Sequence, residues 1–252
     1  MNNTTRITSL AGKIAFVQGG SRGIGAAIVR RLVQEGASVA FTYVSSVDKA
    51  NALVMEIEKA GGTALALQAD SANEQQLRQA VEKAAHHFGH INILVNNAGI
   101  FKVGTLEEIG MEDFDSTLAI NVRSVFVASQ EAVRHMPDGG RIITIGSTNA
   151  ERMPFAGGAV YAMSKSAIVG LTKGLARDLG HRGITVNNIQ PGPTDTDMNP
   201  ASGEMAEELI KLIAVNRYGK DSEIAAFVAF LSSPEAGYIS GASLTIDGGF
   251  GA

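Results

Sequence analysis

Short apolar runs alternate along the chain with longer segments in which apolar residues recur every three or four positions. The short runs lack strict alternation of apolar and polar residues, which predicts strands that are covered on both faces. The longer segments have the period of helices with one apolar face. The predicted strands span residues 13–17, 38–43, 63–68, 91–95, 141–145, 184–189 and 243–246, and the predicted helices span residues 24–34, 48–59, 74–88, 111–136 and 160–179.

The order of these elements predicts one doubly wound α/β domain. Strands and helices alternate at short spacing, which favours a parallel sheet with right-handed crossovers. We therefore expect a seven-stranded parallel sheet flanked by helices. No Pro-rich linker or low-complexity tract divides the 252 residues. We expect a single domain over 1–252, with a cofactor half up to about residue 150 and a catalytic and substrate half beyond it.

Composition and charge argue against several classes of protein. The formal net charge is −4, so the chain lacks the basic balance typical of a nucleic-acid binder. It has no cysteine, which excludes disulfides, thiolate nucleophiles and cysteine-ligated zinc. We find no apolar core of a secretory signal and no stretch near the roughly 20 apolar residues that span a bilayer. We expect a cytoplasmic protein with no nucleic-acid or membrane partner.

The first predicted strand runs into a glycine-rich turn that leads into a predicted helix. Its glycines, Gly19, Gly23 and Gly25, have the spacing G-x-x-x-G-x-G. At a helix N-terminus, bare backbone N–H groups and the helix dipole can hold a pyrophosphate, which side chains would keep away. A glycine-rich turn without a ligand is the alternative, and the position directly after the first strand favours the phosphate site.

The end of the second predicted strand indicates which dinucleotide binds. An enzyme that uses NAD usually carries Asp or Glu there to bond the ribose 2′-hydroxyl, but here no acid occurs before Asp48. Arg22 in the glycine turn can hold a 2′-phosphate, with Ser45 and Ser46 as further donors. We therefore predict NADP(H) rather than NAD(H). The alternative for Arg22 is a solvated loop charge.

Tyr161 and Lys165 are spaced to share one face of a helix. A tyrosine has a pKa of about 10, and a nearby ammonium favours its phenolate. This spacing alone is a weak signal, but Ser147 strengthens it because Ser147 ends the fifth predicted strand, where a parallel sheet presents residues to its ligand crevice. The G-x-S-x-G sequence of a serine hydrolase is missing around Ser147.

Together these segments resemble the short-chain dehydrogenase/reductase family over almost the whole chain. The matching segments are GGSRGIG at 19–25, NNAG at 96–99, Asn121 in NVRSVF, Ser147, YAMSK at 161–165, PGPTDTDM at 191–198 and the terminal IDGGF. The resemblance implies a single-domain Rossmann fold and hydride transfer between a nicotinamide and a carbonyl or alcohol substrate. Within the family, the chain is similar to bacterial 3-oxoacyl-acyl-carrier-protein reductases and to a subgroup described as cyclic-di-GMP-binding biofilm-dispersal proteins.

The resemblance also implies roles for individual residues. Tyr161 is the expected acid and base, Ser147 orients the carbonyl, Lys165 tunes Tyr161, and Asn121 holds a helix kink and a proton-relaying water. Asp70 is expected to bond the adenine amino group, and Asn97 to lie along the adenosine ribose. The expected cofactor contacts are Gly19, Ser21, Arg22, Gly23, Ile24, Gly25, Tyr43, Ser45, Ser46, Asp70, Asn97, Ala98, Gly99, Tyr161, Lys165, Pro191, Gly192, Thr194 and Thr196, the last two at the carboxamide.

Two departures from the family pattern affect the turn and the substrate side. Gln18 replaces the threonine that commonly opens the glycine turn, which puts one local hydrogen bond in doubt. The interval from Ser147 to Tyr161 is one residue longer than usual, so the loop 149–158 is expected to border the substrate. Arg152 in that loop either contacts an anionic substrate or is a surface charge. The expected substrate residues are Ser147, Asn149, Arg152, Tyr161 and Met198.

Three further expectations concern metal binding, the segment 201–215 and the oligomeric state. His86, His87 and His90 lack the spacing of a metal site, so we interpret them as a solvated helix end and predict no metal. The segment 201–215 is either an amphipathic lid over the substrate or plain surface packing. The resemblance implies a homotetramer, with a homodimer as the alternative.

The predicted function is an NADPH-dependent reductase that converts a ketone or 3-oxoacyl substrate into the alcohol. The alternative is a regulatory protein that binds the cofactor and a nucleotide such as cyclic-di-GMP with little turnover. All four expected catalytic positions are present, which favours the enzyme.

Overall fold

A computed structural model describes residues 9–203 and 205–252 and contains the predicted parallel sheet. Seven strands lie in the order β3-β2-β1-β4-β5-β6-β9, and every neighbouring pair is parallel. The strands are β1 (Ile14–Gln18), β2 (Ser38–Tyr43), β3 (Ala64–Gln68), β4 (Ile93–Asn96), β5 (Arg141–Ile145), β6 (Thr185–Pro191) and β9 (Ser243–Ile246). The chain order reverses between β1 and β4, and a ligand crevice is expected at such a point.

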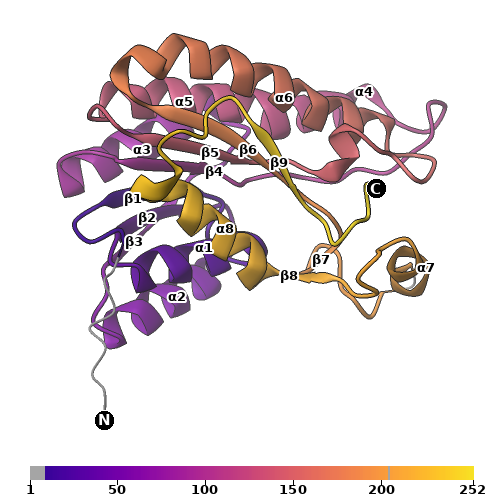
Figure 1. Cartoon of the computed structure of the whole chain (residues 1–252), viewed down its shortest axis with the longest axis horizontal. Helices are drawn as coiled ribbons and strands as arrows, with labels where there is room; N and C mark the ends of the chain where they lie inside the picture. Colours follow the sequence, from indigo (N-terminus) through magenta and orange to yellow (C-terminus); the bar gives the residue numbers. More distant parts are fainter. Residues whose placement is uncertain (1–8, 204) are drawn as a thin grey trace.

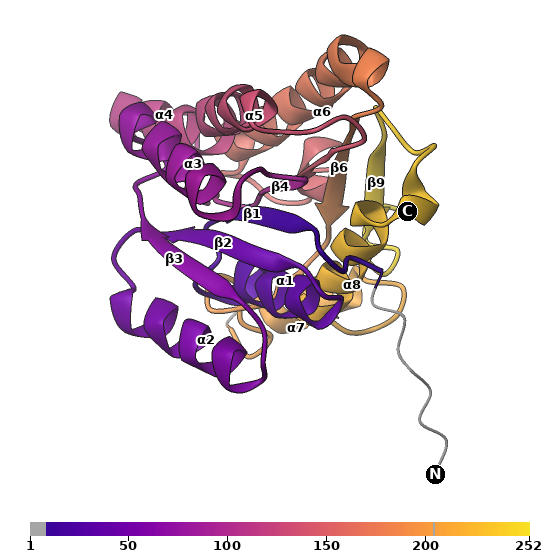
Figure 2. The same cartoon turned by 90° about the vertical axis from the view of Figure 1, so that its left-hand side faces the viewer.

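Helices cover both faces of the sheet, as Figures 1 and 2 show. One layer holds α1 (Gly23–Gln34), α2 (Val47–Lys59) and α8 (Asp221–Ser232), and α8 packs against α1. The opposite layer holds α3 (Glu74–Phe88), α4 (Met111–Leu118), α5 (Ser124–Arg134) and α6 (Ala159–Leu179). A small two-stranded sheet, β7 (Thr194–Asp195) with β8 (Gly219–Lys220), lies apart from the main sheet, next to α7 (Ala206–Lys211).

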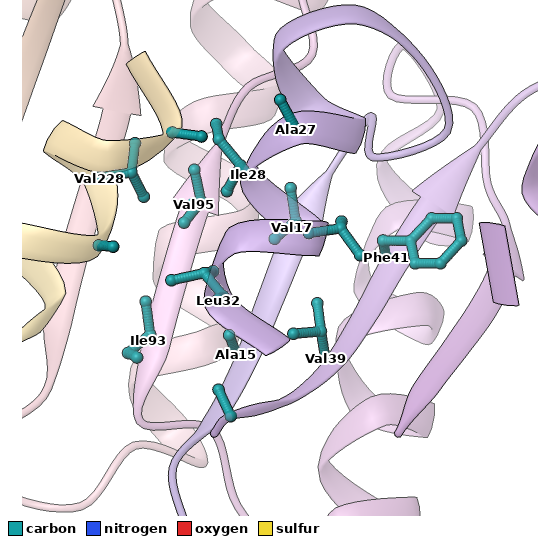
Figure 3. Close-up of a cluster of buried hydrophobic side chains, with 14 of the residues drawn as sticks. Ala15, Val17, Ala27, Ile28, Leu32, Val39, Phe41, Ile93, Val95 and Val228 are labelled. Atoms are coloured by element: carbon teal, nitrogen blue, oxygen red, sulfur yellow. The ribbon is translucent and has the colours of Figure 1, made fainter. Parts of the chain in front are cut away.

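Alternate residues of each strand supply two separate cores. Val17, Val39 and Ile93 face α1 and α8, where Leu32 is fully buried (Figure 3). Phe16 and other strand residues pack on the opposite face against α3 and α5. Burial of each large apolar side chain stabilises the fold by about 1.5–3 kcal/mol. This explains why the strands have continuous apolar runs, since both of their faces are covered.

The helix predicted over 111–136 is interrupted. Between α4 and α5 lies a π-helical turn, Ala119–Arg123, which contains the buried Asn121. Such a turn inserts one residue into the helical hydrogen-bond pattern and bends the helix. The kink that the resemblance implied at this position is therefore present as a π-helical turn.

The remaining differences are small. β1 begins and ends one residue later than predicted, and β4 begins two residues later and ends one residue later. In the segment 201–215, the helix is limited to α7. Ile213 packs near there in a small separate cluster with Tyr218 and Phe250. No helix within the described part of the chain is long and apolar enough to cross a membrane.

Candidate active site

One cleft at the carboxyl ends of the central strands contains every predicted cofactor residue, from Gly19 to Thr196. The strands β1, β4, β5 and β6 point their ends at it, because parallel strands finish at the same edge of a sheet. The cleft is also lined by residues that the sequence analysis did not single out. These are Thr42, Val44, Ser71, Ile100, Ile120, Ile145, Gly146, Asp197 and Asn199. Thr42, Val44, Ile145 and Gly146 lie at or next to a predicted strand end, and for them that position was the signal available in the sequence.

The glycine turn is held open by hydrogen bonds from two sides. The Gly19 backbone N–H donates to the Thr42 hydroxyl at 2.9 Å. The Asn97 side-chain amide donates to the Gly19 carbonyl at 2.8 Å and to the Gln18 carbonyl at 3.2 Å. Thr42 and Asn97 therefore fix the turn in spite of the substitution at Gln18. Asn97 lines the cleft, as its expected place beside the ribose requires, but its amide also supports the turn.

The space beside the glycine turn fits a pyrophosphate. Gly19 and Gly23 have φ angles of +70° and +51°, which favour glycine. A Cβ on Gly25 would lie 2.1 Å from the Gly19 carbonyl oxygen, so this position admits no side chain without a shift of the backbone. The side chain of Arg22, the residue before α1, makes no capping hydrogen bond. The first N–H groups of α1 are thus left for a ligand at the end of the helix dipole.

A polar corner lies where β2 ends and α2 begins. Arg22 from the glycine turn and Tyr43, Ser45 and Ser46 from the β2–α2 connection line this part of the cleft. Ser46 is the residue before α2, yet its side chain makes no capping hydrogen bond. Hydroxyl groups and a guanidinium without a nearby lining carboxylate from β2 suit a phosphate better than a ribose hydroxyl.

Asp70 lines the cleft just after β3, and its bond to the adenine amino group stays a prediction. One of its carboxylate oxygens accepts a hydrogen bond from the Ala72 backbone N–H at 2.9 Å. This bond orients the carboxylate after β3, and Ser71 beside it also lines the cleft.

The four predicted catalytic residues come together from three elements. Ser147 follows β5 and is buried, while Tyr161 and Lys165 lie one turn apart in the first half of α6. The Lys165 Nζ donates to the Ile145 carbonyl oxygen at 3.0 Å and lies 5.6 Å from the centre of the Tyr161 ring. The geometry therefore places an ammonium, a phenol and a serine hydroxyl at one end of the cleft.

Asn121 secures this end of the cleft. Its Oδ1 accepts from the Ile100 N–H at 2.9 Å, and its Nδ2 donates to the Ile100 carbonyl at 3.0 Å. The same Nδ2 donates to the Ser164 hydroxyl at 3.0 Å. Asn121 thus joins the π-helical turn, the segment after β4 and α6. The water relay implied for it stays a prediction.

Burial dominates the electrostatics of Tyr161 and Lys165. Burial raises the pKa of Tyr161, and a hydrogen bond with the Ser147 hydroxyl opposes that rise. Burial also lowers the pKa of Lys165 to about 8, because the low-dielectric surroundings disfavour the ammonium. The expected fall in the Tyr161 pKa therefore does not arise from the chain alone.

Two of the five expected substrate residues lie away from the cleft. The Arg152 guanidinium donates to the Phe250 carbonyl and lies 5.4 Å from the centre of the Phe250 ring. Arg152 is thus neither a cleft residue nor a free surface charge, since it anchors the C-terminal segment. Asn149 donates its backbone N–H to the Ser147 hydroxyl at 3.1 Å, and its side chain is not part of the lining. Met198 does line the cleft, with Ser147 and Tyr161.

An aromatic wall stands beside Tyr161 that the sequence analysis did not predict. The Phe101 ring lies edge-on to the Tyr161 ring, with centres 4.7 Å apart. Phe155, from the lengthened loop, lies edge-on to Phe101 at 6.3 Å. The signal for Phe101 was its position two residues after the NNAG segment, at the end of β4.

The histidine cluster is not arranged as a metal site. His86 lies edge-on to His135, with ring centres 6.4 Å apart, and His87 packs on Phe88. Within residues 9–203 and 205–252, no group of three His, Cys, Asp or Glu residues is placed to hold a metal ion.

Known proteins are similar to this chain in both sequence and fold. A family described as enoyl-(acyl carrier protein) reductase matches residues 19–251. The cyclic-di-GMP-binding biofilm dispersal mediator protein of Escherichia coli (strain K12) is 50% identical over 244 residues, which is 97% of this chain and 99% of that protein.

Two solved structures resemble the whole chain. A short-chain dehydrogenase/reductase from Serratia marcescens BCRC 10948 is 67% identical, with a TM-score of 0.96 over 97% of this chain and 100% of that one. A short-chain dehydrogenase from Burkholderia cenocepacia J2315 in complex with NADP is 54% identical, with a TM-score of 0.96 and the same coverage. The predicted preference for NADP(H) agrees with the latter complex.

Proposed function

Because the chain belongs to the short-chain dehydrogenase/reductase family, we propose that it is an NADP(H)-dependent reductase of ketone or 3-oxoacyl substrates. One observation carries this proposal. Ser147, Tyr161 and Lys165 line the same cleft as the N-terminus of α1, where the glycine turn leaves room for a pyrophosphate. A structural or purely sensory protein would need no acid and base beside its cofactor.

The chain's own groups have defined tasks in this reaction. When bound, NADP(H) donates or accepts the hydride and, in its oxidised form, adds a positive charge beside the phenol. The hydroxyls of Ser147 and Tyr161 hold the substrate oxygen, and Tyr161 Oη gives its proton to that oxygen during reduction. Lys165 stabilises the phenolate that remains, since an ammonium within a few ångströms favours the charged form. In the reverse direction Tyr161 takes the proton back.

The walls near Tyr161 favour a ketone with an apolar group. Phe101 packs on Tyr161 and Phe155 packs on Phe101, while Met198 lines the cleft from the loop after β7. Apolar walls around a few fixed polar groups are typical of small-molecule sites. Aryl ketones and 3-oxoacyl esters both combine a carbonyl with such an apolar group.

A substrate panel with both cofactors tests the proposal. We expect oxidation of NADPH with aryl ketones and 3-oxoacyl esters, and much slower oxidation of NADH. Tyr161→Phe is expected to lower kcat by about 10²–10⁴-fold, the usual range for loss of a general acid, while the Kd for NADPH stays unchanged. A variant that keeps the wild-type rate would refute the assigned role of Tyr161.

The second candidate function is binding of cyclic-di-GMP. The observation that favours it is the 50% identity to the E. coli protein named for that ligand. Titration calorimetry with cyclic-di-GMP, with and without NADPH, tests this function. Submicromolar binding combined with no turnover on the whole carbonyl panel would favour a sensor over an enzyme.

We also propose that the chain forms a homotetramer, with a homodimer as the alternative. Met111 on α4, Phe126 on α5 and Met163 on α6 are exposed on the same helical layer. Exposed large apolar residues on one layer are typical of an interface. Multi-angle light scattering measures the oligomeric state directly.

A further inference from the structure

One ion pair joins helix α2 to the loop after β7. The Lys49 Nζ lies 2.7 Å from the Asp197 Oδ2, although the two residues are 148 positions apart. Lys49 belongs to the first turn of α2, three residues after Ser46 of the polar corner. Asp197 lines the cleft itself. The pair therefore connects the phosphate corner with the loop that carries Met198.

Asp197 and Met198 form the tip of a tight turn. The Asn199 backbone N–H donates to the Thr196 carbonyl at 3.1 Å, and the Thr196 N–H donates back at 3.4 Å. Thr196 also lies against the glycine turn, 3.6 Å from where a Cβ on Gly23 would be. The Asp197 carboxylate and Met198 therefore belong to one hydrogen-bonded turn that lines the cleft.

Two cations, Lys49 and Arg22, act on the Asp197 carboxylate, and cations of this kind also bind phosphate. The hydrogen bond and charge of Lys49 hold the pKa of Asp197 below its usual range, with a smaller effect from Arg22. Arg22 is also the cation expected to meet a 2′-phosphate. A carboxylate and a phosphate therefore compete for the same cations.

We propose that the Lys49–Asp197 ion pair is a latch that the 2′-phosphate of NADP(H) opens. Lys49 exchanges the Asp197 carboxylate for the phosphate, and the turn 196–199 is released to reposition Met198 at the substrate. A 2′-phosphate carries close to two negative charges and three strong acceptor oxygens. Both partners of the pair are 57% exposed, and such exposed pairs are weak enough to exchange.

The latch makes Lys49 a specificity residue with two effects. It adds affinity for the phosphorylated dinucleotide, and it couples that affinity to the loop beside the substrate. A dinucleotide without the phosphate leaves the pair closed. NADP(H) and NAD(H) are therefore expected to differ in the state of the 196–199 turn as well as in affinity.

Two small nucleotides without a nicotinamide test the effect of the 2′-phosphate separately from hydride transfer. Adenosine 2′,5′-bisphosphate carries the 2′-phosphate, and AMP does not. Titration calorimetry of the full chain with both is compared for the wild type, Lys49→Met, Asp197→Asn and the double variant. Lys59→Met, at the exposed opposite end of α2, is the matched control.

The proposal predicts how each variant changes the affinity for the two nucleotides. Lys49→Met is expected to weaken the bisphosphate about fivefold and to leave AMP unchanged, while Asp197→Asn tightens the bisphosphate about threefold, in the range for exposed ion pairs. The double variant should bind the bisphosphate about as weakly as Lys49→Met, because Asp197 acts mainly through Lys49 and only to a small extent through Arg22. Equal effects on both nucleotides, or no effect of Lys49→Met, would overturn the proposal.

Hydrogen–deuterium exchange of the segment 195–203 tests the coupling. In the wild type, saturation with the bisphosphate is expected to speed exchange in this segment, and saturation with AMP is not. In Asp197→Asn the exchange is fast from the start and responds to neither nucleotide. An identical response of the wild type to both nucleotides would show that the loop does not sense the phosphate.

Discussion

The Lys165 ammonium donates to the carbonyl oxygen of Ile145 at 3.0 Å, so the cation is held at the end of the strand that precedes Ser147. This arrangement fixes the charge but leaves it almost fully buried. A buried ammonium is costly unless it is compensated. The site therefore has a cation whose position serves the proposed chemistry at the expense of stability.

Replacement of Lys165 should make this cost measurable. Burial lowers the Lys165 pKa to about 8 in the folded chain, against about 10.4 in the unfolded chain. Below pH 8 both states hold the proton and the folded state bears the full cost, about 3 kcal/mol. Between pH 8 and 10.4 the unfolded state holds more protons, so this cost is relieved as the pH rises.

Lys165→Met is accordingly expected to raise the free energy of unfolding at pH 7 by about 2 kcal/mol, after loss of one hydrogen bond worth about 1 kcal/mol. The gain should shrink towards pH 10.4, and turnover should be lost. Urea unfolding at pH 7 and pH 10 measures both values. A variant that is less stable than the wild type at pH 7 would contradict the buried cost.

Removal of the Ser147 hydroxyl should shift the titration of Tyr161. The hydrogen bond with Ser147 opposes the rise that burial causes in the Tyr161 pKa. Ser147→Ala is therefore expected to raise this pKa further and to move the Tyr161-dependent limb of the alcohol-oxidation pH profile to higher pH. Ultraviolet titration of the phenol gives an independent readout. An unchanged profile in Ser147→Ala would mean that the hydroxyl does not act on Tyr161.

A side chain at Gly25 should close the pyrophosphate site. Its Cβ would lie 2.1 Å from the Gly19 carbonyl oxygen and 2.6 Å from the Asn97 Nδ2. We expect Gly25→Ala to weaken NADPH binding about 10- to 100-fold, the effect of losing about one hydrogen bond to a charged phosphate. Gly174→Ala is the control, because a Cβ on Gly174 of α6 meets nothing within 4 Å. The control should bind NADPH normally and gain about 0.5–1 kcal/mol of stability.

The fold could be predicted from the periodicity of apolar residues. Parts of the site could not, because they depend on contacts between segments that are distant in the sequence. The strands were predictable because apolar runs covered on both faces have a simple pattern. The π-helical turn was not, because the apolar period continues through it and its Asn121 pairs with Ile100, 21 positions away. The role of Arg152 could not be predicted from its loop either, because its hydrogen-bond partner, the Phe250 carbonyl, is 98 positions away.

The packing of Phe101 on Tyr161 also joins distant segments and could not be predicted from the sequence. It leads to a prediction about substrates. The Phe101 ring meets the Tyr161 ring edge-on at 4.7 Å. An aryl ring of a substrate that packs on Phe101 in the same way would gain about 0.5–1.5 kcal/mol, so Phe101→Ala is expected to raise the KM for an aryl ketone about two- to tenfold. A small aliphatic 3-oxo ester should be affected less. Steady-state kinetics on both substrates decide this, and equal changes in KM would argue against a substrate contact.

Gln18 is expected to be a stability defect inside the glycine turn. Its side chain is fully buried on β1, and neither Oε1 nor Nε2 has a hydrogen-bond partner among the described residues. A buried polar group without a partner costs about 1–3 kcal/mol, and an apolar replacement of similar shape removes that cost. Gln18→Met is therefore expected to raise the free energy of unfolding by about 1 kcal/mol or more.

NADPH binding should survive this change, because Thr42 and Asn97 hold the turn through the backbone of residues 18 and 19. Urea unfolding and NADPH titration of Gln18→Met measure the two properties separately. Gln18→Glu is the opposing control, since it adds an unpaired charge at the same buried position and should destabilise the fold by several kcal/mol. If Gln18→Met unfolded more easily than the wild type, the Gln18 amide would have to be hydrogen-bonded in solution, most simply to a buried water.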